Sequence, residues 1–169
     1  ARMPDADTAE GLSVTRVDPA SGRIECVIMS IEGLVLFSGQ SDEQIRIKRA
    51  MGPFENETFA ARMFADIRRV FFPPQGQIIA AGKSPDSDWI CRYKLDAGGF
   101  VDVARLTDTQ ARITEYSARR KKRQTVYLSW DKQTAGIRRP ADRIVIERHG
   151  LLGYGLVLDR IEYTPVDRK

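Results

Sequence analysis

One stretch of the chain differs in pattern from everything around it: residues 55–71 read ENETFAARMFADIRRVF. Its apolar side chains recur at spacings of three and four, which places them on one face of an α-helix. Two prolines at 73 and 74 end this helix, because proline cannot continue one. The face carries three phenylalanines and therefore needs a large apolar surface to cover; its members are Phe59, Met63, Phe64, Ile67, Val70 and Phe71.

On both sides of this helix, apolar and polar residues alternate with a period of two, which indicates half-buried β-strands. Turn residues separate the runs, and strands in sequential order favour an antiparallel meander. The expected strands span residues 23–31, 34–37, 44–48, 78–81, 89–95, 100–106, 111–116, 125–130, 143–147 and 154–163.

These elements predict an α+β fold in which a long antiparallel sheet curves and the amphipathic helix plugs its concave face. A length of 169 residues suits a single domain. Residues 1–11 are small, acidic and without periodicity, so we expect a flexible N-terminal tether there and one curved-sheet domain over residues 12–169.

The composition excludes several classes of protein. With 42% hydrophobic and 30% charged residues it is globular. The apolar runs are far shorter than the roughly 20 residues that cross a bilayer, so we expect no integral membrane protein. A single histidine, His149, and two cysteines exclude most histidine- or cysteine-based catalysts. Cys26 and Cys91 lie in strand-like runs and fit either one disulfide or two buried thiols.

A search for catalytic patterns finds none. The chain has no glycine-rich phosphate loop and no nucleophile elbow. His149 precedes a glycine in an expected turn, and the carboxylates of Asp86 and Asp88 lie in a polar loop. We therefore predict a protein that is not an enzyme and that has no catalytic residues, no metal site and no cofactor.

Positive charge is concentrated in one place. The net charge is +4, and a single run holds five cations. Such a run is typical of a solvated hairpin loop, but it also suits phosphate-rich surfaces, nucleic acid or lipid head groups. Tyr127 and Trp130 follow it and could stack on bases, yet only 8% of residues are aromatic, which makes nucleic acid an unfavoured partner. The basic surface consists of Arg119, Arg120, Lys121, Lys122 and Arg123.

The C-terminal part carries the most specific pattern. A strand at residues 125–130 (TVYLSW) is followed by a polar turn with Gly136, by the sequence RRP at 138–140, and by two alternating strands at 143–147 and 154–163. This order resembles the end of the LolA/LolB-like superfamily of periplasmic lipoprotein carriers and outer-membrane lipoprotein receptors. The resemblance implies an unclosed β-barrel of about ten or eleven strands, with helices as a lid over an apolar cavity for acyl chains.

The resemblance also implies a non-enzymatic bacterial envelope protein, a lipoprotein in the periplasm that an N-terminal lipid anchors to the outer membrane. Its partner would be a lipid or a lipidated protein, and a membrane surface is a further expected contact. The sequence begins at Ala1 and not at a cysteine, so the anchor is expected upstream of it. We expect a monomer.

The candidate ligand-binding residues come from alternate strand positions and from the helix face. Each methylene group of an acyl chain buried there would contribute about 0.8 kcal/mol. The alternative is that the same side chains fill the core and leave no cavity. The candidates are Ile28, Leu36, Phe59, Met63, Phe64, Ile67 and Tyr127.

A second apolar feature is the glycine-flanked pair Leu151 and Leu152 in an expected hairpin tip. We expect membrane contact there, unless the tip folds back on the sheet.

Three functions remain after this reading: a carrier of a hydrophobic ligand, an envelope interaction or assembly module with a filled core, and a basic nucleic-acid-binding domain. An apolar cleft above about 300 Å³ would favour the first. An exposed apolar patch over a solid core would favour the second. A steep dependence of nucleic-acid binding on salt would favour the third.

Overall fold

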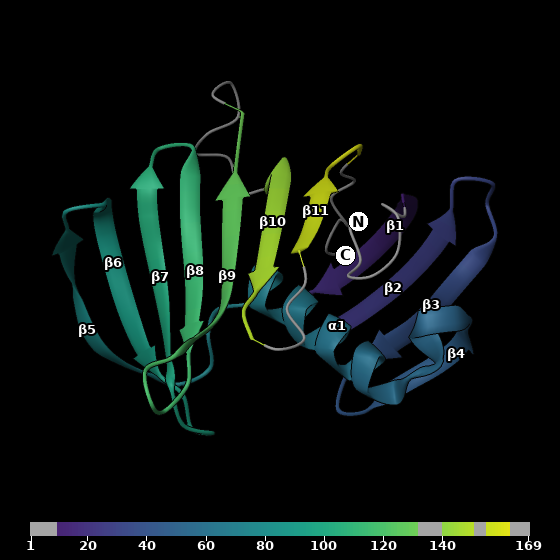
Figure 1. Cartoon of the computed structure of the whole chain (residues 1–169), viewed down its shortest axis with the longest axis horizontal. Helices are drawn as coiled ribbons and strands as arrows, with labels where there is room; N and C mark the ends of the chain where they lie inside the picture. The colour runs from purple at the N-terminus through teal and green to yellow at the C-terminus, as the bar shows by residue number, and fades with distance from the viewer. Residues whose placement is uncertain (1–9, 132–139, 151–154, 163–169) are drawn as a thin grey trace. The chain divides into compact units, whose positions relative to one another are not determined.

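The computed structural model describes residues 10–131, 140–150 and 155–162, and the chain divides into two compact units with the boundary between Pro73 and Pro74. Each unit contains one antiparallel sheet (Figure 1).

The first unit is a four-stranded meander followed by helices. Its strands pair in sequential order, so that β1 and β4 are the two edges. The elements are β1 (Gly11–Asp18), β2 (Arg23–Ser30), β3 (Val35–Ser41), β4 (Ile45–Ala50), the short 3₁₀ helix η1 (Gly52–Glu55) and α1 (Glu57–Phe71).

The predicted helix is confirmed, and its ends have clear causes. At its start, the side-chain oxygen of Asn56 accepts a hydrogen bond from the backbone N–H of Thr58 at 2.9 Å, which caps the first turn. At its end, the N–H of Phe72 donates to the carbonyl of Arg68, and the two prolines follow. Arg68 and Arg69 in the last turn suit the negative end of the helix dipole.

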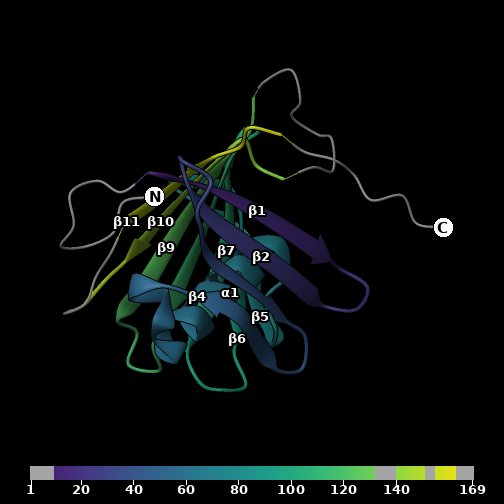
Figure 2. The same ribbon diagram turned by 90° about the vertical axis from the view of Figure 1, so that its right-hand side faces the viewer.

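Aromatic rings join α1 to its sheet. The Phe64 ring lies 6.0 Å from that of Phe37 on β3, and the Phe54 ring lies 5.7 Å from Phe37 on another side. A side chain on Gly39 would come within 2.9 Å of the Phe37 ring, so the glycine provides the space in which that ring lies. Ile24 is buried on the same face of the sheet. Figure 2 shows β1 and β2 in front of α1.

The second unit is a seven-stranded antiparallel meander in sequential order, with β5 and β11 at its edges. One face carries a buried apolar row at Cys91, Ile113, Val126 and Ile146. The strands are β5 (Gln77–Ser84), β6 (Ser87–Lys94), β7 (Phe100–Thr107), β8 (Gln110–Tyr116), β9 (Lys122–Ser129), β10 (Arg143–Arg148) and β11 (Gly155–Asp159).

The α+β class, the antiparallel pairing and the open sheets agree with the prediction, but the single long sheet does not. The described residues form eleven strands in two sheets of four and seven. The interruption falls between β4 and β5, where η1 and α1 occupy the chain. The edge strand β4 also has a shifted register against β3 and carries three cations, features that discourage further pairing.

The strand β1 and the short helix η1 are the elements that the sequence reading missed. The tether was expected to end at residue 11 and no strand was expected before residue 23, whereas Gly11 already begins β1. The rest of the expected tether, residues 1–9, lies outside the described residues. Of the two alternatives for the cysteines, a disulfide or two buried thiols, the structure shows the second: Cys26 and Cys91 are both buried free thiols.

Candidate functional site

Most of the predicted ligand residues lie in the first unit, on the side where α1 covers the sheet. Phe64 is buried against Phe37, and Ile28 is the direct cross-strand neighbour of Phe37. Phe59 meets Phe54 edge-on with ring centroids 5.3 Å apart. Because Phe37, Phe54 and Phe64 are each no more than 2% exposed, these rings form a packed core. Met63 and Ile67 are half-buried beside them on α1.

Two predicted ligand residues are not part of this group. Leu36 lies in β3 at the register shift between Ile28 and Met29, where the regular alternation of the two faces is interrupted, and its side chain is half-buried. Tyr127 lies on β9 in the second unit, where it pairs with Arg112 and Val145.

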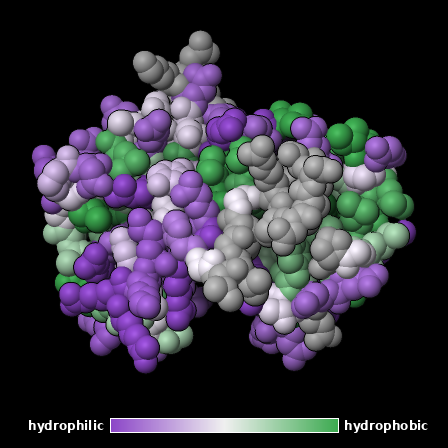
Figure 3. All heavy atoms as spheres, viewed as in Figure 1, coloured by the Kyte–Doolittle hydropathy of each residue, from purple (hydrophilic) through white to green (hydrophobic). Residues whose placement is uncertain are grey.

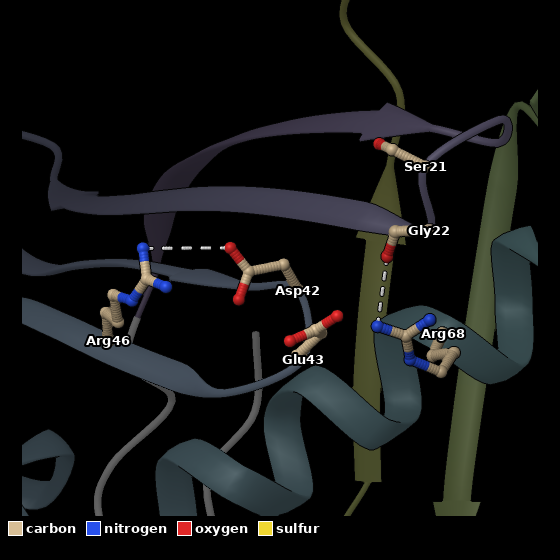
Figure 4. Close-up of a pocket in the computed structure, with 6 residues that line it drawn as sticks. All are labelled: Ser21, Gly22, Asp42, Glu43, Arg46 and Arg68. Atoms are coloured by element: carbon tan, nitrogen blue, oxygen red, sulfur yellow. Dashed lines mark hydrogen bonds and ion pairs between the residues drawn. The ribbon is translucent and has the colours of Figure 1, made fainter.

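A pocket of about 340 Å³ opens in the first unit, but its lining is polar (Figure 4). The Arg68 guanidinium donates to the carbonyl of Gly22 at 3.0 Å and lies 5.1 Å from the Phe72 ring centroid. Opposite it, Arg46 and Asp42 approach to 3.8 Å. The backbone N–H of Gln44, 3.1 Å away, is the main cause that lowers the pKa of Asp42. Ser21 and Glu43 complete a lining that does not suit an acyl chain.

A smaller pocket of about 260 Å³ lies on the second unit over β5, β6 and β7. Ala80 and Gly82 make its floor shallow, and Arg92 and Asp102 line one side. Two hydrogen bonds of 2.7 Å join this guanidinium to this carboxylate. Asp102 is only 6% exposed, so the arginine neutralises a buried charge, and two of its five N–H donors are used in doing so.

The face of the four-stranded sheet opposite α1, here called the helix-free face, offers a different kind of surface. The register places Leu12 beside Met29 and Met29 beside Val35, and it places Val14 beside Val27. Leu12 is 42% and Val14 60% exposed, while the others are half-buried. Together they form a contiguous apolar patch at one end of the sheet: Leu12, Val14, Val27, Met29 and Val35.

The other end of the helix-free face is rich in arginine. One row across the four strands holds two arginines, a glutamate and a glutamine. Arg23 follows on β2, and Arg49 lies beside Ser38 on β4. This basic end therefore carries four arginines on one face: Arg16, Arg23, Arg46 and Arg49.

Three carboxylates of the basic end are already bound within the unit. Arg23 binds Glu25 at 2.5 Å, and Arg46 approaches Asp42 to 3.8 Å. Asp18, at the end of β1, accepts hydrogen bonds in the β1–β2 turn from the N–H of Ala20 at 3.0 Å and from the hydroxyl of Ser21 at 2.6 Å. The four arginines outnumber these three acidic side chains by one, so the end keeps a small excess of positive charge.

The β2–β3 hairpin extends the apolar end of this face. Backbone hydrogen bonds from Gly33 to Ser30 and from Ser30 to Leu34 close the turn. They leave Ile31 63% and Leu34 47% exposed at its tip. Figure 3 shows hydrophobic side chains gathered where this hairpin is drawn, and a mostly hydrophilic surface over the strands of the second unit.

The remaining predicted sites are placed as follows. The basic surface is exposed on the β8–β9 hairpin, where Arg120 takes a positive φ of 58° in the turn. Arg123 approaches Glu115 to 3.8 Å. His149 lies 3.2 Å from the hydroxyl of the buried Thr125. The predicted membrane-contact residues Leu151 and Leu152 lie outside the described residues.

Two searches of the described residues bear on chemistry. No group of three or more His, Cys, Asp and Glu side chains among them could hold a metal ion. No helix among them is long and apolar enough to cross a membrane.

Comparison with known protein families, with curated proteins and with solved structures finds no match. The function must therefore be argued from the surfaces described above.

Sequence reasoning missed the helix-free face because it missed β1. The signal was present: residues 12–17 read LSVTRV, in which apolar and polar residues alternate. Extending the alternation search to residue 11 would have placed Leu12 and Val14 together on one face.

Proposed function

We propose that the protein is a non-enzymatic interaction module that binds an apolar, acidic partner on the helix-free face of its four-stranded sheet. The observation that supports this is the apolar patch joined to a basic end on one sheet face. Isolated exposed apolar residues need no explanation, but a contiguous patch with a polar rim is typical of a docking surface.

The chemistry of the face suggests the partner. Burial of the patch would be favourable by about 25 cal/mol for each Å² of apolar surface removed from water. The four arginines outnumber the three acidic side chains of the basic end, Asp18, Glu25 and Asp42, and all three of those are already bound within the unit. Carboxylates on the partner therefore complement this end, while aliphatic side chains complement the other.

The packed aromatic core, the polar lining of the larger pocket and the ion pair in the smaller one favour a surface interaction over an internal ligand. Phe37, Phe54 and Phe64 leave little space between α1 and the sheet. The acyl-chain cavity of an unclosed barrel, which the resemblance implies, stays a prediction.

A second candidate is the carrier or receptor of a lipid or lipidated protein in the bacterial periplasm. The exposed Ile31 and Leu34 at the β2–β3 tip favour it, because a protruding apolar tip can enter the interface of a membrane. In this candidate the partner is the acyl chain or the lipid surface, and the protein is a lipoprotein anchored outside the sequence given.

A binding experiment with defined probes separates the candidates. The first probe is a designed amphipathic peptide with a leucine stripe and a glutamate face; its matched control has lysine in place of glutamate. We expect the acidic peptide to bind more tightly, as measured by fluorescence anisotropy, and we expect Arg49→Glu and Met29→Glu each to weaken that binding. Lys83→Glu on β5 is the control with the same charge change on the other unit.

The second set of probes is vesicles of zwitterionic or anionic phospholipid and a fluorescent fatty acid. Binding to these that is lost in Ile31→Glu and Leu34→Glu, with no binding of the acidic peptide, would favour the lipid candidate. Equal affinity for the acidic and basic peptides would contradict the proposed interaction module.

A further inference from the structure

The edges of the two sheets differ in how they are protected against pairing with another strand. Natural edge strands are guarded by bulges, charges or short length. β4 has a shifted register and carries Arg46, Lys48 and Arg49; β5 has two register shifts; and β11 has only five residues. Among the edges of the described sheets, β1 alone is both long and regular: its eight residues pair with β2 in unbroken register, and its two charged residues, Arg16 and Asp18, lie at its C-terminal end.

β1 presents both backbone and apolar groups for a further strand. In an antiparallel pair, alternate residues direct N–H and C=O away from the partner strand, so half of the β1 residues offer these groups at the free edge. Leu12 and Val14 are exposed along the same strand. An exposed, regular, apolar edge of this kind is a template for strand addition.

The side chains along β1 are complementary to themselves in the antiparallel direction. Leu12, Val14 and Arg16 lie on the helix-free side of β1, and one further step of the alternation puts Glu10, which directly precedes the strand, on the same side. The order acid, apolar, apolar, base becomes base, apolar, apolar, acid on reversal. If two copies meet with Ser13 opposite Ser13, Leu12 lies opposite Val14, and Glu10 lies opposite Arg16. The charge pair and the apolar pair are thus each formed twice by symmetry.

We infer that two copies of this chain pair through β1, antiparallel and in the register that places Ser13 opposite Ser13. The two four-stranded sheets then form one continuous eight-stranded sheet. This inference is independent of the proposed function: the pairing uses the edge of the sheet, and it leaves the helix-free face open.

Neighbouring registers are less favourable. A shift that places Val14 opposite Val14 brings Glu10 against Asp18 and Leu12 against Arg16. The opposite shift places Leu12 against Leu12 and shortens the ladder, so that Arg16 loses its acidic partner. Since opposite charges directly across a strand pair stabilise it and like charges destabilise it, the register centred on Ser13 is selected.

Glu10 and Arg16 are both free to make these contacts. Both are exposed, and the described structure gives neither of them an ion pair. The cross-strand neighbour of Arg16 within one copy is Glu25, whose carboxylate is already bound by Arg23.

A single short ladder buries less surface than the interface of a stable dimer. We therefore expect a dissociation constant between about 1 μM and 1 mM, with monomers at high dilution. The sequence reading expected a monomer, so the two expectations are distinguished by measurement at high concentration.

The test uses charge reversal and complementation, measured by sedimentation velocity over a concentration series. Glu10→Arg and Arg16→Glu each place like charges opposite one another twice, and each should raise the dissociation constant of its own homodimer at least about tenfold. A mixture of the two variants restores both pairs, because the arginine introduced at position 10 of one variant then faces the glutamate introduced at position 16 of the other. The mixture should associate as the unaltered chain does.

Controls keep the result specific to β1. Lys48→Glu on β4 and Glu43→Arg in the turn before it make the same charge changes away from β1, and they should leave the dissociation constant unchanged. Melting temperatures report whether each variant is folded. A monomer up to about 1 mM, or a dimer that both single variants leave intact, would overturn the inference. A mixture that fails to associate would overturn the proposed register.

Discussion

The ring of Phe64 on α1 lies 6.0 Å from the ring of Phe37 on β3, and neither side chain is more than 2% exposed. This contact fixes the helix to the four-stranded sheet at the centre of the first unit. Phe54 packs on Phe37 from η1, so three elements meet at one ring. The aromatic face of α1, which is evident in the sequence, is thus covered by the sheet of its own unit.

Removal of the Phe64 ring should destabilise the first unit strongly. In Phe64→Ala the surrounding rings would border a cavity that collapses only in part, so we expect the free energy of unfolding to fall by about 3–5 kcal/mol. Urea denaturation followed by circular dichroism measures this. Arg62→Ala on the exposed side of α1 is the control, with an expected change within about 0.5 kcal/mol. A similar small change in both variants would mean that the contact is not part of the core.

The Arg92–Asp102 pair gives a second prediction, for the seven-stranded sheet. Asp102 is 6% exposed and depends on the guanidinium for two hydrogen bonds. In Arg92→Met the buried carboxylate loses both, and we expect a loss of about 1–3 kcal/mol in the free energy of unfolding. Lys94→Met, two residues away and exposed, should change it by less than about 0.5 kcal/mol.

A double variant checks the cause. Arg92→Met with Asp102→Leu removes both charges, so no buried carboxylate is left, and this variant should be more stable than Arg92→Met alone. If adding Asp102→Leu deepens the loss, the effect of Arg92 comes from packing and not from its partner.

How far the fold followed from the sequence depended on the length of each pattern. The helix at residues 55–71 was placed within two residues, because six apolar side chains and two prolines define it. Strands such as β7 and β10 were found because their alternation lies between strong turn signals. β1 was missed because residues 12–17, between the expected tether and the turn signal at 18–22, show only a short alternation and were assigned to no strand.

The division into two sheets could not be read from strand periodicity. Alternation gives the two faces of a strand but not its neighbour, and the end of pairing at β4 depends on a local register shift beside Gly39. The candidate site had the same limit. Tyr127 was grouped with residues of the helix and its sheet, whereas it lies on β9 in the other unit. The sequence also does not show which strands form the sheet edges, so it gave no reason to compare the bulges and charges that protect those edges against further pairing.

Burial should keep the thiol of Cys26 unreactive. Loss of hydration raises the pKa of this thiol, more than the contacts of the Thr15 and Ser13 hydroxyls at 3.7 and 3.8 Å lower it. A thiol reagent should therefore label Cys26 only when the chain is unfolded, which mass spectrometry of the labelled peptides can locate. Labelling of Cys26 in the folded chain as fast as in the unfolded chain would contradict its burial.

The same pKa shift has a consequence for stability. The folded state favours the protonated thiol, so this contribution is complete below the ordinary thiol pKa and declines as pH rises above it, since the unfolded chain ionises first. Cys26→Ala should therefore show a smaller loss of stability at alkaline pH than the unaltered chain. The quantity compared is the change in the free energy of unfolding between two pH values, taken within each protein. The destabilisation caused by the smaller alanine side chain is the same at both pH values and therefore cancels.

Asp86 provides the final prediction, on the β5–β6 turn. Its carboxylate accepts a hydrogen bond of 2.6 Å from the Ser84 hydroxyl and one of 2.8 Å from Arg112, which lower its pKa to about 2. The stabilisation is present above the ordinary aspartate pKa and is lost as the pH falls toward 2, but full exposure makes its effect on stability small. The pKa itself is therefore the quantity to measure, by an NMR titration of the side-chain carboxyl carbon. Ser84→Ala and Arg112→Gln should each raise it, because the hydroxyl is the largest single cause of the low pKa and the guanidinium lowers it both by a hydrogen bond and by its charge. An ordinary pKa for Asp86 in the unaltered protein would show that this turn is open in solution.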